Sequence, residues 1–234
     1  MDYKEHYRQD AIVFDYFGAD QLSPGERRRN RYIIDYCKIK PSMKILDVGS
    51  GRGWFSLEAS ARGAKVTALD LSAENLKRIR ELDPQIDTLL GDACDIPGEP
   101  QDYDLIVALE VLEHIPDPAL ALSSIRSKLK PGGILLLTVP YKEFIKSSLC
   151  IHCNRKTPHN AHLHSFDAPG LRRLLRSSGY RILETKLFAH KLMTALRLNE
   201  LSQRLPYGCW QALDRLFGTG NDKYHYLAIK ARIK

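Results

Sequence analysis

The feature that most constrains this chain is a regular alternation of short apolar segments with helical ones from Met43 onward. Five segments have the composition of buried strands, at residues 44–48, 65–70, 87–90, 103–109 and 134–139. Polar, amphipathic stretches separate them, and Ser72 followed by Glu74 is a typical start for the helix after the second strand. Near-continuous apolar strands between such helices indicate an α/β fold, with a mostly parallel sheet and helices on both faces.

The rest of the chain adds strands and a cover to this sheet. A helix is expected at 169–178, and strands at 181–187 and 224–233 bring the predicted sheet to seven strands. Residues 1–40 are polar and helical, and apolar side chains among four arginines predict a covering helix at 26–38. We therefore expect an N-terminal helical cover at 1–40 and a single α/β domain at 41–234.

A glycine-rich turn follows the first strand. Gly49, Gly51 and Gly53 lie where the first strand gives way to the first helix, and Asp47 precedes them. A turn at this place must be tight and must let a ligand approach the backbone, which side chains would block. The G-x-G-x-G spacing differs from the G-x-G-x-x-G of nicotinamide enzymes, and it suits an amino-acid tail better than a pyrophosphate.

Acidic residues follow the next two strands. Asp70 ends the second strand, where a carboxylate can accept hydrogen bonds from both hydroxyls of a ribose. Asp92 and Ala93 follow Gly91 after the third strand, where an adenine amino group would lie. Because ligands bind at the carboxyl ends of strands in open α/β sheets, these residues predict one nucleoside-binding site.

Together these segments resemble the class I S-adenosylmethionine-dependent methyltransferases. The resemblance is strong over 43–141, and the phrase Glu-Val-Leu-Glu-His-Ile-Pro-Asp at 110–117 is similar to the branch that includes ubiquinone-type and many small-molecule O-methyltransferases. It implies a Rossmann-like fold and S-adenosylmethionine as cofactor. The cofactor-binding residues that it implies are Asp47, Gly49, Ser50, Gly51, Gly53, Asp70, Leu71, Asp92, Ala93 and Leu109.

The function implied by the resemblance is methyl transfer to a small-molecule acceptor, including a sugar- or lipid-linked one. Other functions fit parts of the same pattern, because a fold does not fix a function. A tRNA or protein methyltransferase would use the same cofactor site, and a non-enzymatic module would use it for nucleotide binding or docking. An NAD-dependent oxidoreductase shares the fold class, but the glycine spacing and the turn at Pro131, Gly132 and Gly133 disfavour it.

Titratable residues follow the fourth strand and are candidates for acid–base chemistry. Glu110 and His114 are the predicted catalytic residues, with Glu113 between them, because a hydroxyl acceptor must lose a proton during methyl transfer. His114 is attractive as a base because an unperturbed imidazole titrates near neutral pH. The structural alternative is that the two glutamates flank a helix and that His114 only packs.

A second cluster of chemistry-bearing residues lies in a loop at 148–165. Cys150 and Cys153 form a C-x-x-C pair, and we expect His162 and His159 to complete a zinc site with them, His164 being the alternative fourth ligand. Such a metal would be structural if four protein ligands close it. Three alternatives are a redox pair, incidental cysteines, and a role for His162 in the acceptor site.

A basic amphipathic insertion is expected at 189–220, either as a lid over the acceptor pocket or as a peripheral membrane contact. The net charge of +7 favours acidic partners. Nothing in the chain resembles a nucleic-acid-binding module, so we expect no nucleic-acid partner. No signal peptide or transmembrane run is evident, which predicts a cytoplasmic protein; the oligomeric state is left open.

Overall fold

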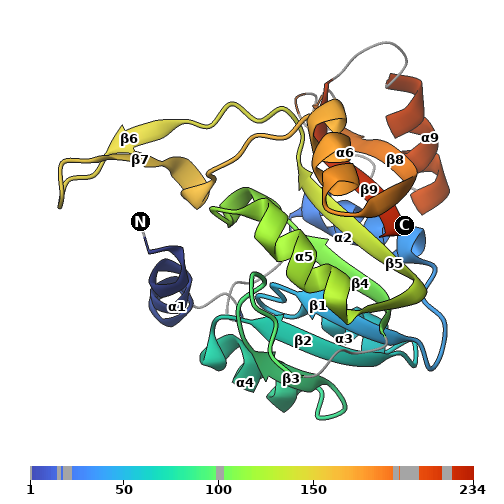
Figure 1. Cartoon of the computed structure of the whole chain (residues 1–234). Coiled ribbons are helices and arrows are strands. Elements are labelled where there is room, and N and C mark those ends of the chain that lie inside the picture. The colour runs from blue at the N-terminus through green and yellow to red at the C-terminus, as the bar shows by residue number, and fades with distance from the viewer. Residues whose placement is uncertain are drawn as a thin grey trace.

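The computed structural model describes residues 2–14, 17, 23–98, 103–191, 195, 206–217 and 223–234. Its centre is a seven-stranded sheet in the order β3-β2-β1-β4-β5-β9-β8 (Figure 1). Strands β1 to β5 are mutually parallel, and β9 pairs antiparallel with both β5 and β8. The predicted Rossmann-like, mostly parallel sheet is confirmed.

The elements alternate along the chain as the sequence indicates. The sheet strands are β1 (Lys44–Val48), β2 (Lys65–Asp70), β3 (Asp87–Leu90), β4 (Tyr103–Leu109), β5 (Leu129–Pro140), β8 (Tyr180–His190) and β9 (Tyr224–Ile233). The helices are α1 (Tyr3–Val13), α2 (Pro24–Cys37), α3 (Trp54–Ser60), α4 (Ala73–Leu82), α5 (Pro118–Lys128), α6 (Ala168–Ser177) and α9 (Tyr207–Phe217). Short 3-10 turns are η1 (Leu112–His114) and η2 (His159–Ala161).

Both faces of the sheet are covered, because alternate residues of each strand point to opposite faces. Leu46 of β1 packs in a core that includes Leu122 of α5 and Leu171 of α6. Its neighbour Ile45 packs in a second core, which contains side chains of α2, α3 and α4. This two-faced burial explains why the strands are apolar throughout.

Strand β5 begins five residues before the predicted start at residue 134. Its pairing with β4 shifts register between Leu129 and Ile134, so the intervening turn residues bulge out of the ladder. Gly132 has a positive φ of 80°, which favours glycine at that position. The proline and glycines that predicted a break therefore form a bulge inside one strand.

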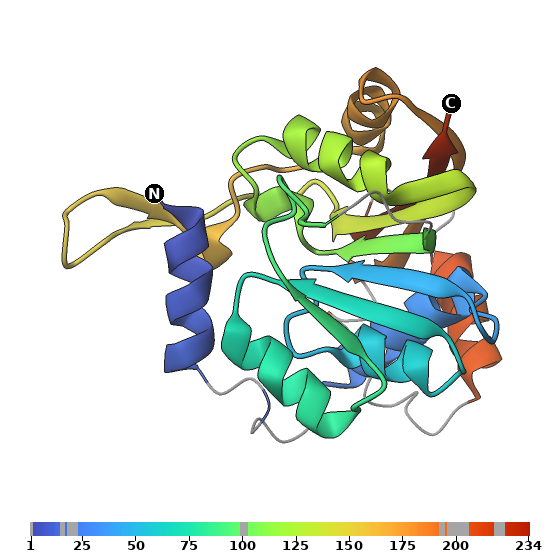
Figure 2. The same ribbon diagram turned by 60° about the horizontal axis from the view of Figure 1, so that its bottom comes forward.

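The two helices of the N-terminal segment occupy different places. Helix α2 buries Ile33 and Ile34 against the sheet and is an integral part of the domain. Helix α1 buries none of its residues and stands at the carboxyl edge of the parallel strands (Figure 2). The predicted cover at 1–40 thus contains one packed helix and one lightly attached helix.

Two further segments flank the domain. The short strands β6 (Ser147–Leu149) and β7 (Lys156–Pro158) form a hairpin that projects from the body of the molecule (Figure 1). In the predicted insertion at 189–220, helix α9 is described, whereas residues 192–194, 196–205 and 218–220 lie outside the described residues. Among the helices that the structure describes, none is long and apolar enough to cross a membrane.

Candidate functional site

The glycine turn after β1 is shaped by backbone conformations that side chains disfavour. Gly49 has a φ of 69°, and a Cβ added there would lie 2.7 Å from Val111. Gly53 has a φ of 72°, and its Cβ would lie 2.5 Å from Ile79. Both positions therefore require glycine, because a side chain would strain the backbone and collide with a neighbour.

Asp70 stands opposite this turn with both carboxylate oxygens held by backbone donors. The N–H of Gly51 donates to Oδ2 and the N–H of Ser72 donates to Oδ1, each at 2.8 Å. These bonds fix the carboxylate at the end of β2 and leave lone pairs for a ligand. A ribose whose two hydroxyls donate to Asp70 fits this arrangement.

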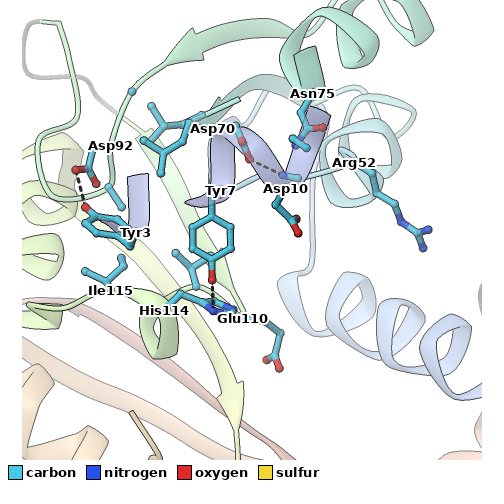
Figure 3. Close-up of a pocket in the computed structure, with 18 residues that line it drawn as sticks. Tyr3, Tyr7, Asp10, Arg52, Asp70, Asn75, Asp92, Glu110, His114 and Ile115 are labelled. Carbon is cyan, nitrogen blue, oxygen red and sulfur yellow. Dashed lines mark hydrogen bonds between the residues drawn. The ribbon is translucent and has the colours of Figure 1, made fainter. Parts of the chain in front are cut away.

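A cavity of about 290 Å³ runs from the glycine turn toward the end of β4 (Figure 3). Six of the predicted cofactor-binding residues line it: Gly49, Gly51, Asp70, Leu71, Asp92 and Ala93. The predicted catalytic residues Glu110 and His114 line the same cavity. The predicted nucleoside-binding residues and the titratable side chains thus line one cavity.

Four predicted cofactor residues do not line this cavity. Asp47 is buried and accepts a hydrogen bond from the Ser56 hydroxyl at 2.7 Å, which braces the turn from below. Gly53 begins α3, while Ser50 is buried in the turn and Leu109 lies at the end of β4. Because these four residues lie outside the lining of the cavity, their positions suit a role in shaping the turn and the strand end.

The sequence did not reveal the contribution of α1. Tyr3, Tyr7, Asp10 and Ala11 of this helix line the cavity. The Tyr3 hydroxyl donates to Asp92 at 2.6 Å, and the Lys4 ammonium lies 2.6 Å from the same oxygen. The one sequence pattern that could have indicated this role is the i, i+4 spacing of Tyr3 and Tyr7, which places two phenols on one face of the helix.

Two acidic groups lie near the end of β4: Glu110 lines the cavity, and Glu113 is buried beside His114. Glu110 follows β4 with a left-handed φ of 57°, a conformation that is rare for residues other than glycine. Burial raises the pKa of Glu110 to about 7. Burial, and next the charge of Glu110, raise the pKa of Glu113 well above its ordinary value.

His114 joins these carboxyl groups to the cavity. Burial, and next the neighbouring His162, lower the pKa of His114 to about 4, so its ring is neutral at pH 7. Nδ1 lies 2.5 Å from the Tyr7 hydroxyl, and Nε2 lies 3.9 Å from a carboxylate oxygen of Glu113. A neutral imidazole in this position can accept a proton.

Comparison with known proteins decides the family. The family described as a methyltransferase domain matches residues 25–185. The chain belongs to this methyltransferase-domain family. The resemblance to class I S-adenosylmethionine-dependent methyltransferases that the motifs indicated is thereby confirmed.

Two curated relatives of this methyltransferase domain share one name. A ubiquinone biosynthesis O-methyltransferase of Xanthomonas campestris pv. campestris is 36% identical over 137 residues, which are 55% of this chain and 57% of that protein. One from Xanthomonas euvesicatoria pv. vesicatoria is 39% identical over 136 residues, with the same coverage. The chain therefore spans a little over half the length of the curated relatives that it matches.

Solved structures share the fold. A 1,6-didemethyltoxoflavin-N1-methyltransferase from Burkholderia thailandensis superposes with a TM-score of 0.64 at 20% identity, covering 100% of this chain and 89% of that one. A phosphoethanolamine N-methyltransferase 2 from Haemonchus contortus gives a TM-score of 0.69 at 18% identity, covering 100% and 60%. The [4+2]-cyclase SpnF gives a TM-score of 0.64 at 21% identity, covering 93% and 86%.

The methyltransferase domain does not assemble the predicted zinc site. Cys150 and Cys153 lie at the tip of the projecting β6–β7 hairpin, whereas the predicted ligands His159 and His162 follow its second strand. The ring of His162 instead contacts Glu143 and packs on His114, 4.7 Å between ring centroids. The described residues therefore do not bring the four predicted ligands together, and the zinc site remains a prediction. His162 lies instead against His114, which lines the cavity.

Within the described residues, another group can hold a cation. Ligand atoms of Glu113, His114 and His162 all lie within 4.8 Å of one another, and no other group of three or more does so among the residues that the structure describes. Both carboxylate oxygens of Glu113 are buried without a hydrogen-bond partner in the described part of the chain. One carboxylate and two imidazoles are ligand types that divalent transition metals accept.

The raised pKa of Glu113 makes a stability prediction for the free protein. A carboxyl whose pKa is higher in the folded state contributes stability that is lost as pH rises above its unfolded pKa of about 4.3. We expect the wild type to melt earlier at pH 8 than at pH 5, and Glu113→Gln to reduce this loss. At pH 8 the variant should melt a few degrees higher, since about 1 kcal/mol corresponds to roughly 2–4 °C. Scanning calorimetry of both proteins at both pH values checks this. A difference in Tm between the variant and the wild type that is the same at pH 5 and at pH 8 would contradict it.

Proposed function

We propose that this protein transfers a methyl group from S-adenosylmethionine to a hydroxyl of a small molecule. The observation that carries the proposal is the single cavity that joins Asp70 and the glycine turn to Glu110 and His114. S-adenosylmethionine would supply a methyl group on a sulfonium, already activated for displacement. The chain's own residues must bind it, align the acceptor and take up the acceptor's proton.

The residues present fit this cofactor. A Cβ added at Gly51 would meet nothing within 4 Å, so there is room for a ligand above the turn. Asp70 would hold the ribose hydroxyls, and Asp92 with Ala93 would border the adenine, as the resemblance implies. The glycine turn would then border the methionine portion, which places the methyl group toward the end of β4.

The cofactor would supply the methyl group to the acceptor oxygen, and its sulfur would keep the electron pair of the carbon–sulfur bond. The acceptor's proton passes to the neutral imidazole of His114, whose low pKa keeps it unprotonated before the step. Glu113 lies beside the ring, with a carboxyl oxygen 3.9 Å from Nε2. The hydroxyl as acceptor also agrees with the O-methyltransferase names of the curated relatives.

A panel of acceptors tests this function. Incubation with methyl-labelled S-adenosylmethionine should label aryl alcohols and polyprenylated phenols as methyl ethers, and should leave matched amines and thiols unlabelled. Product identification by mass spectrometry fixes the acceptor atom. Exclusive labelling of amines, of tRNA or of protein would replace the proposal by one of the alternatives.

The carboxylate of Glu113 supports a second means of activating the hydroxyl. A divalent cation held by Glu113, His114 and His162 would lower the pKa of a bound hydroxyl directly, and His114 would then be a ligand and no longer a base. We expect a chelator to change the initial rate by no more than about twofold, because proton transfer to a histidine needs no metal. Loss of activity on EDTA treatment, with recovery on addition of Mg²⁺ or Mn²⁺, would assign the group to a cation.

A further inference from the structure

Helix α1 contacts both ends of the cavity through polar side chains spaced one helical turn apart. Tyr3 and Lys4 reach Asp92 at the predicted adenine end. Tyr7 reaches Nδ1 of His114 at the acceptor end, at 2.5 Å, with its ring edge-on to the imidazole (Figure 3). One short helix thus touches the residues that would bind the cofactor and the residue that would take the proton.

The attachment of this helix is light. None of its side chains is buried, and Ile12 and Val13 are each 68% exposed. A segment that buries little apolar surface opens at a low free-energy cost. The contacts of Tyr3, Lys4 and Tyr7 are therefore among those that hold α1 over the cavity.

The contact of Tyr7 also bears on the chemistry of His114. A neutral imidazole carries one proton, and the nitrogen that carries it is fixed by the partner of that nitrogen. If Nδ1–H donates to the Tyr7 oxygen, the lone pair of Nε2 is left to accept a proton. Nε2 lies on the side of Glu113, 3.9 Å from a carboxyl oxygen.

We propose that Tyr7 is the positioning residue for His114, and that the proton acceptor of this site is complete only when α1 lies closed over the cavity. This inference rests on the proposed function, in which His114 takes the acceptor's proton. Tyr7 acts through the ring of His114: it sets the ring's orientation and its protonated nitrogen. Tyr3, on the same face of the helix, acts on the cofactor end instead.

Three single substitutions in the full chain separate these roles. Tyr7→Phe removes the hydroxyl at His114, and we expect kcat to fall about 10- to 100-fold, as misorientation of a catalytic group does, with S-adenosylhomocysteine affinity unchanged within about twofold. Tyr3→Phe makes the same chemical change one turn earlier, and should raise the KM for S-adenosylmethionine more than it lowers kcat. Gln9→Ala, on the exposed side of α1, controls for helix integrity.

Two outcomes would contradict the role proposed for Tyr7. If Tyr7→Phe and Tyr3→Phe change kcat and KM in the same proportion, the helix is a general cover and Tyr7 has no separate role. A Tyr7→Phe kcat within about threefold of wild type would also overturn the proposal, since that is less than misplaced catalytic groups cost.

A measurement on the free protein keeps the inference apart from the proposed function. Nitrogen NMR of the His114 ring should show the proton on Nδ1 in the wild type and in Gln9→Ala, and a shift of population toward Nε2 in Tyr7→Phe. A ring protonated on Nε2 in the wild type would refute the assigned orientation. If the ring behaves as expected but no hydroxyl is methylated, the proposed function fails while the Tyr7 contact stands.

Discussion

Replacing His114 with alanine is expected to lower kcat on a hydroxyl acceptor by about 100-fold or more, which is the range that general-base catalysis contributes. The ring lines the acceptor end of the cavity and is neutral at pH 7, so its loss removes the proton acceptor. Affinity for S-adenosylhomocysteine should stay within about twofold of wild type, since Asp70 and the glycine turn are untouched. Steady-state kinetics and calorimetric titration measure the two quantities separately.

A histidine outside the cavity provides the matched control. His159 is exposed at the base of the hairpin, so His159→Ala should leave both kcat and cofactor affinity unchanged. An unchanged kcat in His114→Ala would return that residue to a packing role. A loss of kcat in His159→Ala as large as that in His114→Ala would show that the hairpin is more closely tied to the site than its geometry indicates.

Replacing Asp70 with alanine is expected to weaken S-adenosylhomocysteine binding by about 1–3 kcal/mol, which is roughly 5- to 150-fold in Kd. The substitution removes the acceptor for two ribose hydroxyls and also leaves the N–H groups of Gly51 and Ser72 without their partner. Isothermal calorimetry against the wild type checks the value. Asp87, an exposed carboxylate of β3, gives the control Asp87→Ala, whose Kd should not change. Equal affinities for Asp70→Ala and the wild type would remove Asp70 from the cofactor site.

The sheet and the cofactor end of the site could be predicted because their causes are local. Apolar runs specify buried strands, and Gly49 and Gly53 stand where only glycine fits the backbone. Asp70 ends β2 and Asp92 follows β3, and because these strands are parallel neighbours, topology alone brings the two residues to one edge. A last strand was expected at residues 224–233, and strand β9 covers these residues.

The features that the sequence did not predict depend on contacts between segments far apart in the chain. The spacing of Cys150 and Cys153 is that of a metal knuckle, but a two-stranded hairpin carries the pair away from His162. The side chain of His162 is placed by Glu143 and His114, and no pattern within the loop encodes those partners. Helix α1 meets the cavity through residues about 90 to 107 positions away, as Tyr3 with Asp92 and Tyr7 with His114 show.

The insertion at 189–220 remains a prediction in part. In its described portion, Asp214 of α9 accepts hydrogen bonds from the backbone N–H groups of Ala189 and His190, at 3.2 and 2.7 Å, which anchors the helix to the end of β8. Helix α9 lies on the side of the molecule opposite α1 (Figures 1 and 2). Among the described residues, α1 contributes side chains to the cavity, and the lid at 189–220 remains a prediction.

A crystal structure of the full chain with S-adenosylhomocysteine tests the proposed site most directly. We expect the ribose hydroxyls within hydrogen-bond distance of Asp70, the adenine beside Asp92 and Ala93, and the sulfur directed toward Glu110 and His114. Helix α1 should lie over the ligand with Tyr7 still against His114. A ligand bound outside this cavity, or one whose sulfur points away from His114, would contradict the proposed methyl transfer at the end of β4.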